Sequence, residues 1–244
     1  MATNVWGKEL AEVYDTTSAA MFAPEVLDPC VAALFELARG GPALEFAIGT
    51  GRVALPLSQR GLTVRGIELS APMVEQLRAK AGADAIDVTI GNMTDTRVDG
   101  SFTLVYVVWN SIMNLTTQDE QAAVFANAAR HLEPGGCFVV EVIVPKLRGL
   151  VPGETARVFE LQPDHIGIES FDDFVGQIAS SHHWMTVDGR LVHHAAPYRY
   201  VWPSELDLMA RLAGLRLRER WADWHGAPFT GDSPQQVAIF EKSE

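Results

Sequence analysis

The sequence predicts an α/β protein built on a doubly wound, seven-stranded and mostly parallel sheet. Short apolar runs alternate with helical patterns between residues 42 and 144, and a glycine-rich turn follows the first run. Runs that are apolar throughout are typical of strands buried on both faces, and helices between them make such strands parallel. Right-handed crossovers then place helices on both faces of the sheet.

The composition is that of an ordinary globular chain. Of the 244 residues, 48% are hydrophobic and 20% are charged, and the net charge is −12. An acidic chain repels phosphate backbones, so we expect no nucleic-acid partner. Cys30 and Cys137 lack the spacing of a metal site, and we expect no metal. No leader pattern or long apolar stretch occurs, so we expect a cytoplasmic protein without a membrane segment. The oligomeric state stays open, with a homodimer as one alternative.

The first 40 residues are expected to form a helical cap within a single domain that spans residues 1–244. Helical patterns cover residues 6–20 and 24–39, and two glycines end the second pattern. The alternating part follows it. Strands are predicted at 43–48, 63–68, 86–90, 102–108 and 137–144, and helices at 52–60, 71–81 and 117–132.

The alternation then stops, and residues 145–201 are predicted to be an insertion that carries a β-hairpin. Residues 178–187 and 190–201 are joined by Asp188-Gly189, which is typical of a two-residue hairpin turn. Long insertions in α/β enzymes often cover the site as lids. Residues 156–161 are a further candidate strand, and a helix at 203–213 and strands at 215–221 and 237–241 close the chain.

The turn Gly49-Thr50-Gly51 joins the first strand to the first helix of the alternating part. Glycine lets a ligand approach the backbone closely, and the N-terminus of the next helix presents unpaired N–H groups. Glu68 lies at the end of the second strand, where a carboxylate can accept the two hydroxyls of a ribose. These features predict a nucleoside-containing cofactor.

Two cofactor classes fit this loop. Gly49 to Ala54 matches the G-x-G-x-x-A pattern of dinucleotide sites. A pyrophosphate over the loop would be repelled by Glu45, whereas the ammonium and sulfonium of S-adenosylmethionine would be attracted to it. Electrostatics therefore favour S-adenosylmethionine.

Five ordered motifs resemble those of the class I S-adenosylmethionine-dependent methyltransferases, in the branch that methylates natural products and sugars at nitrogen or oxygen. The first covers residues 43–52, with Ala47 at a position that is usually glycine, and the second covers residues 66–73. Gly91-Asn92-Met93 resembles a motif that is usually Gly-Asp-Met. The other two lie at residues 104–115 and 131–136. The resemblance implies a Rossmann-like sheet whose last strand is antiparallel.

The resemblance also implies which residues bind the cofactor. Glu68 would hold the ribose, Asn92 would accept the adenine amino group, and Met93 would pack on the adenine ring. We also expect Tyr14, in the N-terminal cap, to reach the cofactor or the acceptor. The full set of cofactor-binding candidates is Tyr14, Glu45, Ala47, Gly49, Thr50, Gly51, Glu68, Leu69, Met73, Asn92, Met93, Val108 and Asn110.

The hairpin of the insertion is expected to contribute to the acceptor side. A turn at 188–189 without a bulge pairs Trp184 with His193 and His183 with His194. His182 and His183 then lie on opposite faces, and both are catalytic candidates because a histidine with a pKa of about 6.5 can take a proton. The substrate-binding candidates are Trp109, Met113, Trp184, Tyr198 and Arg199.

The sequence therefore predicts an enzyme that transfers a methyl group from S-adenosylmethionine to an oxygen or nitrogen of a small-molecule acceptor, such as a natural product, with S-adenosylhomocysteine as the other product. Two alternatives stay open. One is an NAD-dependent oxidoreductase, and the other is a non-catalytic methyltransferase-like binding module.

Overall fold

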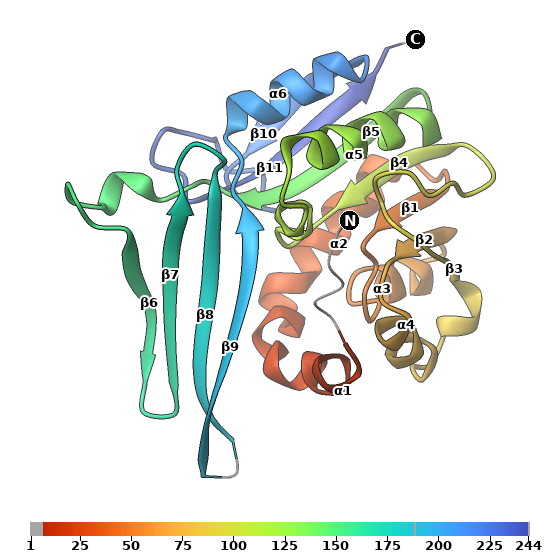
Figure 1. Cartoon of the computed structure of the whole chain (residues 1–244). Helices are drawn as coiled ribbons and strands as arrows, with labels where there is room; N and C mark the ends of the chain where they lie inside the picture. The colour runs from red at the N-terminus through yellow and green to blue at the C-terminus, as the bar shows by residue number, and fades with distance from the viewer. Residues whose placement is uncertain (1–6, 188, 244) are drawn as a thin grey trace.

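The computed structural model describes residues 7–187 and 189–243, which form two separate sheets (Figure 1). The larger has seven strands in the order β10-β11-β5-β4-β1-β2-β3, and β11 runs antiparallel to both of its neighbours. The predicted fold class is confirmed. The strands are β1 (Ala43–Phe46), β2 (Val64–Glu68), β3 (Asp87–Ile90), β4 (Phe102–Val107), β5 (Leu132–Ile143), β10 (Leu215–Trp221) and β11 (Gln235–Lys242).

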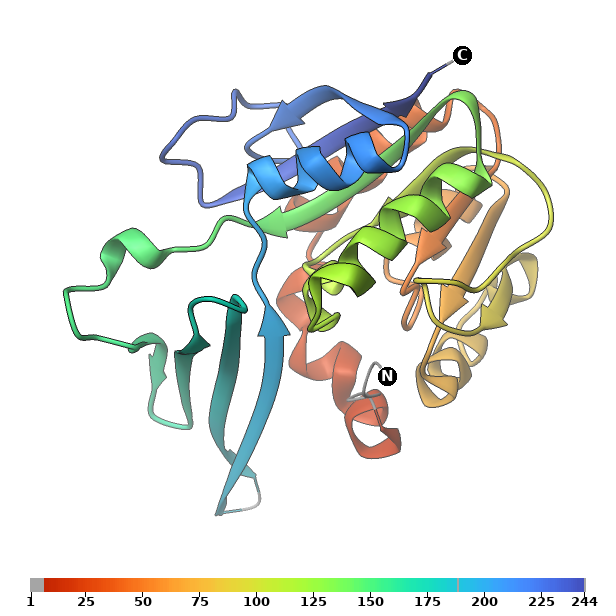
Figure 2. The ribbon, with the colours of Figure 1, turned by 45° about the horizontal axis from the view of Figure 1, so that its top comes forward.

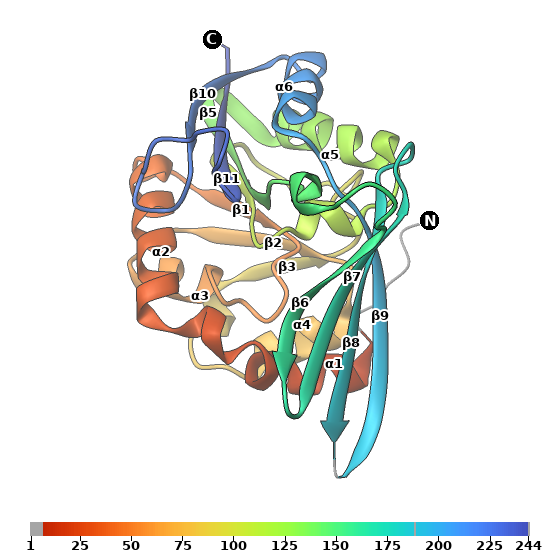
Figure 3. The ribbon, with the colours of Figure 1, turned by 90° about the vertical axis from the view of Figure 1, so that its left-hand side faces the viewer.

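Helices cover both faces of this sheet, because alternate residues of each strand point to opposite sides. Helices α5 and α6 lie on one side of the sheet, and α2 and α3 lie on the other (Figure 3). Leu44 and Phe46 pack in the core under α5 and α6, whereas Ala43 packs in the core under α2 and α3. The helices are α1 (Lys8–Thr17), α2 (Pro24–Ala38), α3 (Ala54–Gln59), α4 (Ala71–Arg78), α5 (Gln118–His131) and α6 (Pro203–Leu212), and short 3-10 helices lie at Ala19–Phe22, Ala83–Ala85, Ser111–Asn114 and Leu147–Gly149.

The insertion forms a second, antiparallel sheet of four strands in the order β6-β7-β8-β9 (Figure 2). The expected pairings of Trp184 with His193 and of His183 with His194 are both present. Asp188, in the predicted turn, lies outside the described residues. The strands are β6 (Ala156–Gln162), β7 (His165–Asp173), β8 (Ile178–Val187) and β9 (Arg190–Arg199).

Two elements differ from the prediction. The strand β7 was not predicted, because His165, Gly167 and Glu169 interrupt the apolar alternation by which a strand is recognised. The strand β5 begins at Leu132, so the expected turn at 134–136 lies inside it, beside a shift of register with β4. Residues 1–6, which overlap the first predicted helix, lie outside the described part. In that part no helix combines the length and apolarity needed to cross a bilayer.

A buried polar network joins the second sheet to the helices of the first. Arg199, at the end of β9, is 4% exposed and forms an ion pair with Glu205 of α6 at 2.6 Å. Its guanidinium also donates to the side-chain oxygens of Gln121 at 2.5 Å and Gln177 at 3.1 Å. Gln121 belongs to α5, and Gln177 lies between β7 and β8. The network therefore fixes the base of the second sheet against α5 and α6.

Arg199→Met is expected to lower the free energy of unfolding by about 3 kcal/mol, because a buried carboxylate loses its cation. Urea denaturation measures this loss. Arg216→Met is the control, since Arg216 pairs with Glu241 but its side chain is 64% exposed, and an exposed pair contributes under about 1 kcal/mol. Equal losses in the two variants would show that the network does not anchor the sheet.

Candidate functional site

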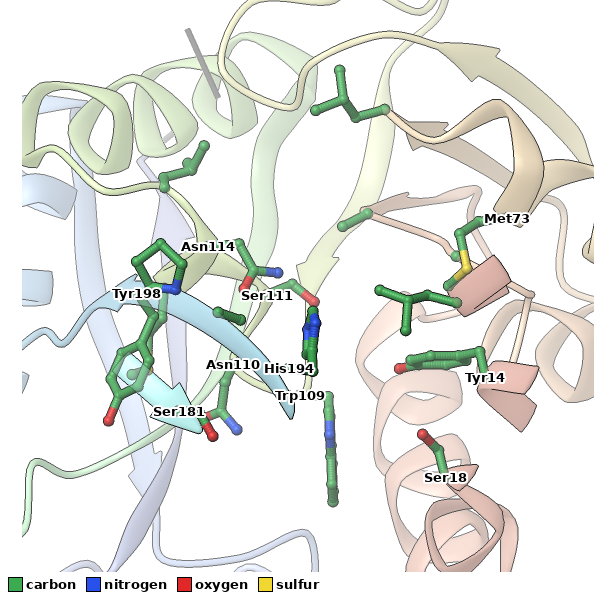
Figure 4. Close-up of a pocket in the computed structure, with 18 of the residues that line it drawn as sticks. Tyr14, Ser18, Met73, Trp109, Asn110, Ser111, Asn114, Ser181, His194 and Tyr198 are labelled. Atoms are coloured by element: carbon green, nitrogen blue, oxygen red, sulfur yellow. The ribbon is translucent and has the colours of Figure 1, made fainter. Parts of the chain in front are cut away.

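A cavity of about 670 Å³ lies between the carboxyl ends of β1, β2 and β4, the helix α1 and one face of the second sheet. Figure 4 shows Tyr14 and Met73 on one side of it, Tyr198 and Ser181 on the other, and Trp109 between them. Many of the predicted site residues line it together. They are Tyr14, Ala47, Gly49, Glu68, Leu69, Met73, Asn92, Met93 and Asn110 of the cofactor set, Trp109, Met113 and Tyr198 of the substrate set, and His183.

The carboxylate of Glu68 ties two turns together at the cavity wall. Its Oε2 accepts the backbone N–H of Gly49 at 2.8 Å, and its Oε1 accepts that of Ser70 at 2.8 Å. Burial raises the pKa of Glu68, and these backbone N–H groups oppose the rise. Glu68 also lines the cavity, so its carboxylate can accept a hydroxyl from a ligand.

The glycine-rich turn has left-handed backbone at Ala47 (φ 54°) and at Gly49 (φ 57°). A residue with a Cβ is strained by about 1–2 kcal/mol in this region, and such strain gathers at functional sites. The turn carries Ala47 and Gly49 into the cavity wall. It is therefore shaped for close approach of a ligand to the backbone.

The helix α1 is fixed to this turn by polar contacts on the side away from the cavity. The hydroxyl of Thr50 donates to Asp15 at 2.6 Å, and Lys80 forms an ion pair with Asp15 and donates to the Thr50 carbonyl at 2.8 Å. These contacts place Tyr14, the neighbour of Asp15, in the cavity wall. Burial raises the pKa of Tyr14, so its hydroxyl stays protonated and can donate a hydrogen bond.

The end of β4 presents two consecutive residues in the left-handed region, Trp109 (φ 54°) and Asn110 (φ 61°). Glu141 of β5 holds them, since its carboxylate accepts the backbone N–H of Trp109 at 2.8 Å and the indole N–H of Trp224 at 2.7 Å. The side-chain oxygen of Asn110 accepts the N–H of Ile143 at 2.7 Å. Neighbouring β5 thus sets the direction in which Trp109 enters the cavity.

Asn92 replaces the acid that the third motif usually carries. Its side-chain oxygen accepts the backbone N–H of Thr94 at 3.1 Å, which fixes the amide beside the cavity. The oxygen has a second lone pair, so it can still accept a hydrogen bond from a ligand.

One face of the second sheet forms the far wall of the cavity. In β8 this face carries Ser181, His183 and Met185, and in β9 it carries His194 and Tyr198. His183 Nδ1 lies 2.8 Å from His165 Nε2, and its Nε2 lies 2.9 Å from the Ser181 hydroxyl. Burial and the neighbouring histidines lower the pKa of His183, so it is neutral at pH 7.

Strand alternation sends other candidates away from the cavity. His182 and Trp184 lie on the opposite face of the second sheet, where their rings stack 5.6 Å apart. His182 also lies 3.0 Å from the hydroxyl of Ser170. Arg199 belongs to the buried network at the base of that sheet. The expectation that these three residues line the site is therefore wrong.

The position of Glu45 also differs from the prediction, and this difference changes the electrostatics of the site. It is 3% exposed, does not line the cavity and accepts the hydroxyl of Tyr106 at 2.9 Å, because β1 points it toward the layer of α2 and α3. Burial raises its pKa from the ordinary 4.5 to about 8, so it is protonated at pH 7. Glu45 therefore does not supply the fixed negative charge that the sequence suggested.

Three more of the predicted cofactor-binding residues lie behind the cavity wall and do not line it. Thr50 faces Asp15, as described above. Gly51 (φ 80°) leaves no room for a side chain, since a Cβ there would lie 2.8 Å from Leu77 of α4. Val108 is 5% exposed and packs in the core under α2. These three support the shape of the site without lining the cavity.

The cavity also contains residues that the sequence analysis did not single out. His165 and Glu169 come from β7, the strand that was not predicted. Polar residues at every second position of this segment were the sequence feature that could have indicated a strand there. Phe159, Met185, Ser18 and Leu10 are further lining residues of this kind. Across residues 7–187 and 189–243, no three His, Cys, Asp or Glu side chains are grouped so that they could hold a metal ion.

The comparisons with known proteins agree with this geometry. Residues 43–136 match the family of methyltransferase domains. The CcbJ methyltransferase from Streptomyces caelestis is 33% identical in sequence, and its structure superposes with a TM-score of 0.84 over 100% of both chains.

Two further relatives are N-methylating enzymes by name. The cypemycin N-terminal methyltransferase of a Streptomyces species is 26% identical over 207 residues, which are 83% of this chain and 84% of that protein. A dTDP-3-amino-3,4,6-trideoxy-alpha-D-glucopyranose N,N-dimethyltransferase of Streptomyces venezuelae is 35% identical over 100 residues, 40% of each chain.

Glu45→Gln is expected to flatten the dependence of stability on pH. Between pH 4.5 and 8 the folded chain keeps a proton on Glu45 that the unfolded chain releases, so the free energy of unfolding falls as pH rises. The slope from one such proton is about 1.4 kcal/mol per pH unit. Urea denaturation at pH 5, 6.5 and 8 measures it.

The exposed residue Glu36 provides the control, and Glu36→Gln should leave the slope of the wild type unchanged. A Glu45→Gln variant with the same slope as the wild type would show that Glu45 is ionised in the folded chain.

Proposed function

The chain belongs to the class I S-adenosylmethionine-dependent methyltransferases, and on this premise we propose that it methylates a nitrogen of a small natural-product molecule. The observation that carries the proposal is the single cavity that joins the turns after β1, β2 and β4 to the polar face of the second sheet. The cofactor is S-adenosylmethionine. When bound, it supplies a methyl carbon attached to a sulfonium, which leaves as the neutral thioether of S-adenosylhomocysteine.

The residues at the ends of β1, β2 and β3 fit this cofactor. Glu68 lines the cavity, and its carboxylate can accept the hydroxyls of a ribose. Asn92 offers a carbonyl oxygen for an adenine amino group. Met73 and Met93 supply soft apolar surface for the adenine ring.

The charge of the cavity wall also suits S-adenosylmethionine better than a dinucleotide. With Glu45 buried and protonated, the negative charge beside the donor loop comes from Glu68. No Lys or Arg among the described residues lines the cavity, so a pyrophosphate would have no cationic partner there. This argument replaces the one that the sequence based on Glu45.

Nitrogen is the better acceptor atom for two reasons. The cypemycin relative is named as an N-terminal methyltransferase, and the dTDP-amino sugar relative as an N,N-dimethyltransferase. An amine acceptor is protonated at neutral pH, and a wall that carries carboxylates attracts it. Oxygen remains the second candidate.

An ammonium acceptor must lose a proton before its nitrogen can attack a carbon, and His183 is the proposed proton acceptor. It lines the cavity, and its lowered pKa keeps it neutral at pH 7. Its contact with His165 offers a route for the proton to the next ring. We assign the second sheet the role of a lid, because its inner face closes the cavity opposite the donor loop and excludes water from the reacting atoms.

The first test is calorimetric titration with S-adenosylmethionine, S-adenosylhomocysteine and NAD. Binding of the first two at micromolar concentration is expected, with no binding of NAD. Glu68→Ala should weaken donor binding about tenfold to hundredfold, because hydrogen bonds to a carboxylate contribute about 1.5–3 kcal/mol. Asp87→Ala, at an exposed acid of neighbouring β3, is the control. Binding of NAD alone would contradict the proposal.

Tyr14→Phe tests the contribution of the N-terminal cap. The variant keeps the ring in the cavity wall and removes the protonated hydroxyl. Affinity for the donor, or kcat/KM once an acceptor is found, should fall about threefold to tenfold, the effect of one hydrogen bond. Glu9→Gln, at an exposed residue of α1 that does not line the cavity, is the comparison. Unchanged binding and kinetics in Tyr14→Phe would remove the hydroxyl from the site.

A further inference from the structure

We propose that the acceptor is a phosphate-free amine, which binds as a neutral molecule or a monocation against Glu169 of the second sheet. The inference deepens the proposed function and rests on it. Within the described residues the charged side chains that line the cavity are two carboxylates, Glu68 on the donor side and Glu169 on the opposite wall. The wall has no Lys or Arg to receive a phosphate.

Two arginines contact residues of the wall, and neither of them lines the cavity. Arg52 lies over the ring of Trp109, 5.4 Å from its centroid, and donates to the carbonyl of Met21 at 3.3 Å. Arg157 of β6 binds Glu169 Oε2 through Nε and Nη2, each at 2.6 Å. In the Arg157–Glu169 pair, only Glu169 lines the cavity. The pair therefore presents its carboxylate, and not its guanidinium, to a ligand.

Glu169 is held in a fixed position. It is 8% exposed, and its Oε1 accepts the hydroxyl of Tyr198, which also lines the cavity. Burial and the adjacent Glu169 raise the pKa of Tyr198, so this hydroxyl keeps its proton and continues to donate. With Arg157 on the other oxygen, the carboxylate cannot turn away. Its Oε1 retains a lone pair for an N–H donor, and the carboxylate has no donor to offer an acceptor-only group such as phosphate.

The free-energy cost of burial in this cavity differs between a phosphate-bearing ligand and an amine. A diphosphate is a multiple anion, and burying such a group without a cation is strongly unfavourable. Proteins bind phosphates through Arg, Lys, metal ions or helix N-termini. An amine needs only the acceptor atoms that Glu169 already presents. The cavity thus selects an amine carried by a molecule that has no nucleotide diphosphate.

The test uses protein saturated with S-adenosylhomocysteine at pH 8, with dTDP as the phosphate-bearing probe and the methyl glycoside of an amino sugar as the amine probe. Calorimetry should show binding of the glycoside, and dTDP should bind at least tenfold more weakly. Glu169→Gln should lower the affinity for the glycoside about tenfold and leave the affinity for S-adenosylhomocysteine unchanged. Tight binding of dTDP, no binding of the glycoside, or no effect of Glu169→Gln would each overturn the proposal.

A matched pair of variants tests charge directly. Met185→Lys places a cation on the cavity face of β8, and Leu191→Lys places the same charge on the other face of the second sheet, where Leu191 is 71% exposed. Only Met185→Lys should gain affinity for dTDP, and equal behaviour of the two variants would overturn the proposal. If the wild type did not bind S-adenosylhomocysteine, the proposed function itself would be refuted. Failure of this proposal and failure of the proposed function are therefore distinguishable.

Discussion

The carboxylate of Glu68 is the contact on which the donor side of the site depends. Gly49 follows β1 and Ser70 follows β2, and both donate their backbone N–H groups to Glu68. Because β1 and β2 are parallel neighbours, their carboxyl ends reach the same edge of the sheet and the two turns can share one side chain. A single buried acid therefore positions both the glycine-rich turn and the start of α4.

The acceptor side depends on a different constraint, which is the two-residue period of the second sheet. Ser181, His183 and Met185 face the cavity, while His182 and Trp184 face away from it. The docking of the sheet decides which set is inside, and Arg199 is the residue that fixes this docking against α5 and α6. Shifting the register of β8 by one residue would exchange the two sets of side chains.

Glu45 and Glu169 show that the surroundings of an acidic residue decide whether it presents a charge to a ligand. Glu45 occurs in a motif where a charge is expected, yet its side chain points into the core, and burial raises its pKa to about 8. Glu169 occurs in no recognised motif, yet Arg157 and Tyr198 hold it at the cavity wall. The negative charge that a ligand meets therefore comes from Glu68 and Glu169.

Sequence alone was sufficient for the alternation of strands and helices from β1 to β5, the parallel sheet, the glycine-rich turn and the position of Glu68, because these follow from local periodicity and from residues adjacent in the chain. It also predicted the pairing of β8 with β9, since the turn sets the register. It missed β7, where polar residues occupy the inward positions, and with it His165 and Glu169. Only the tertiary structure decided which face of the second sheet meets the donor loop and which charges are buried. The orientation of the sheet and the burial of these charges both depend on how segments distant in the sequence pack together. The residues next to a side chain in the sequence do not determine that packing.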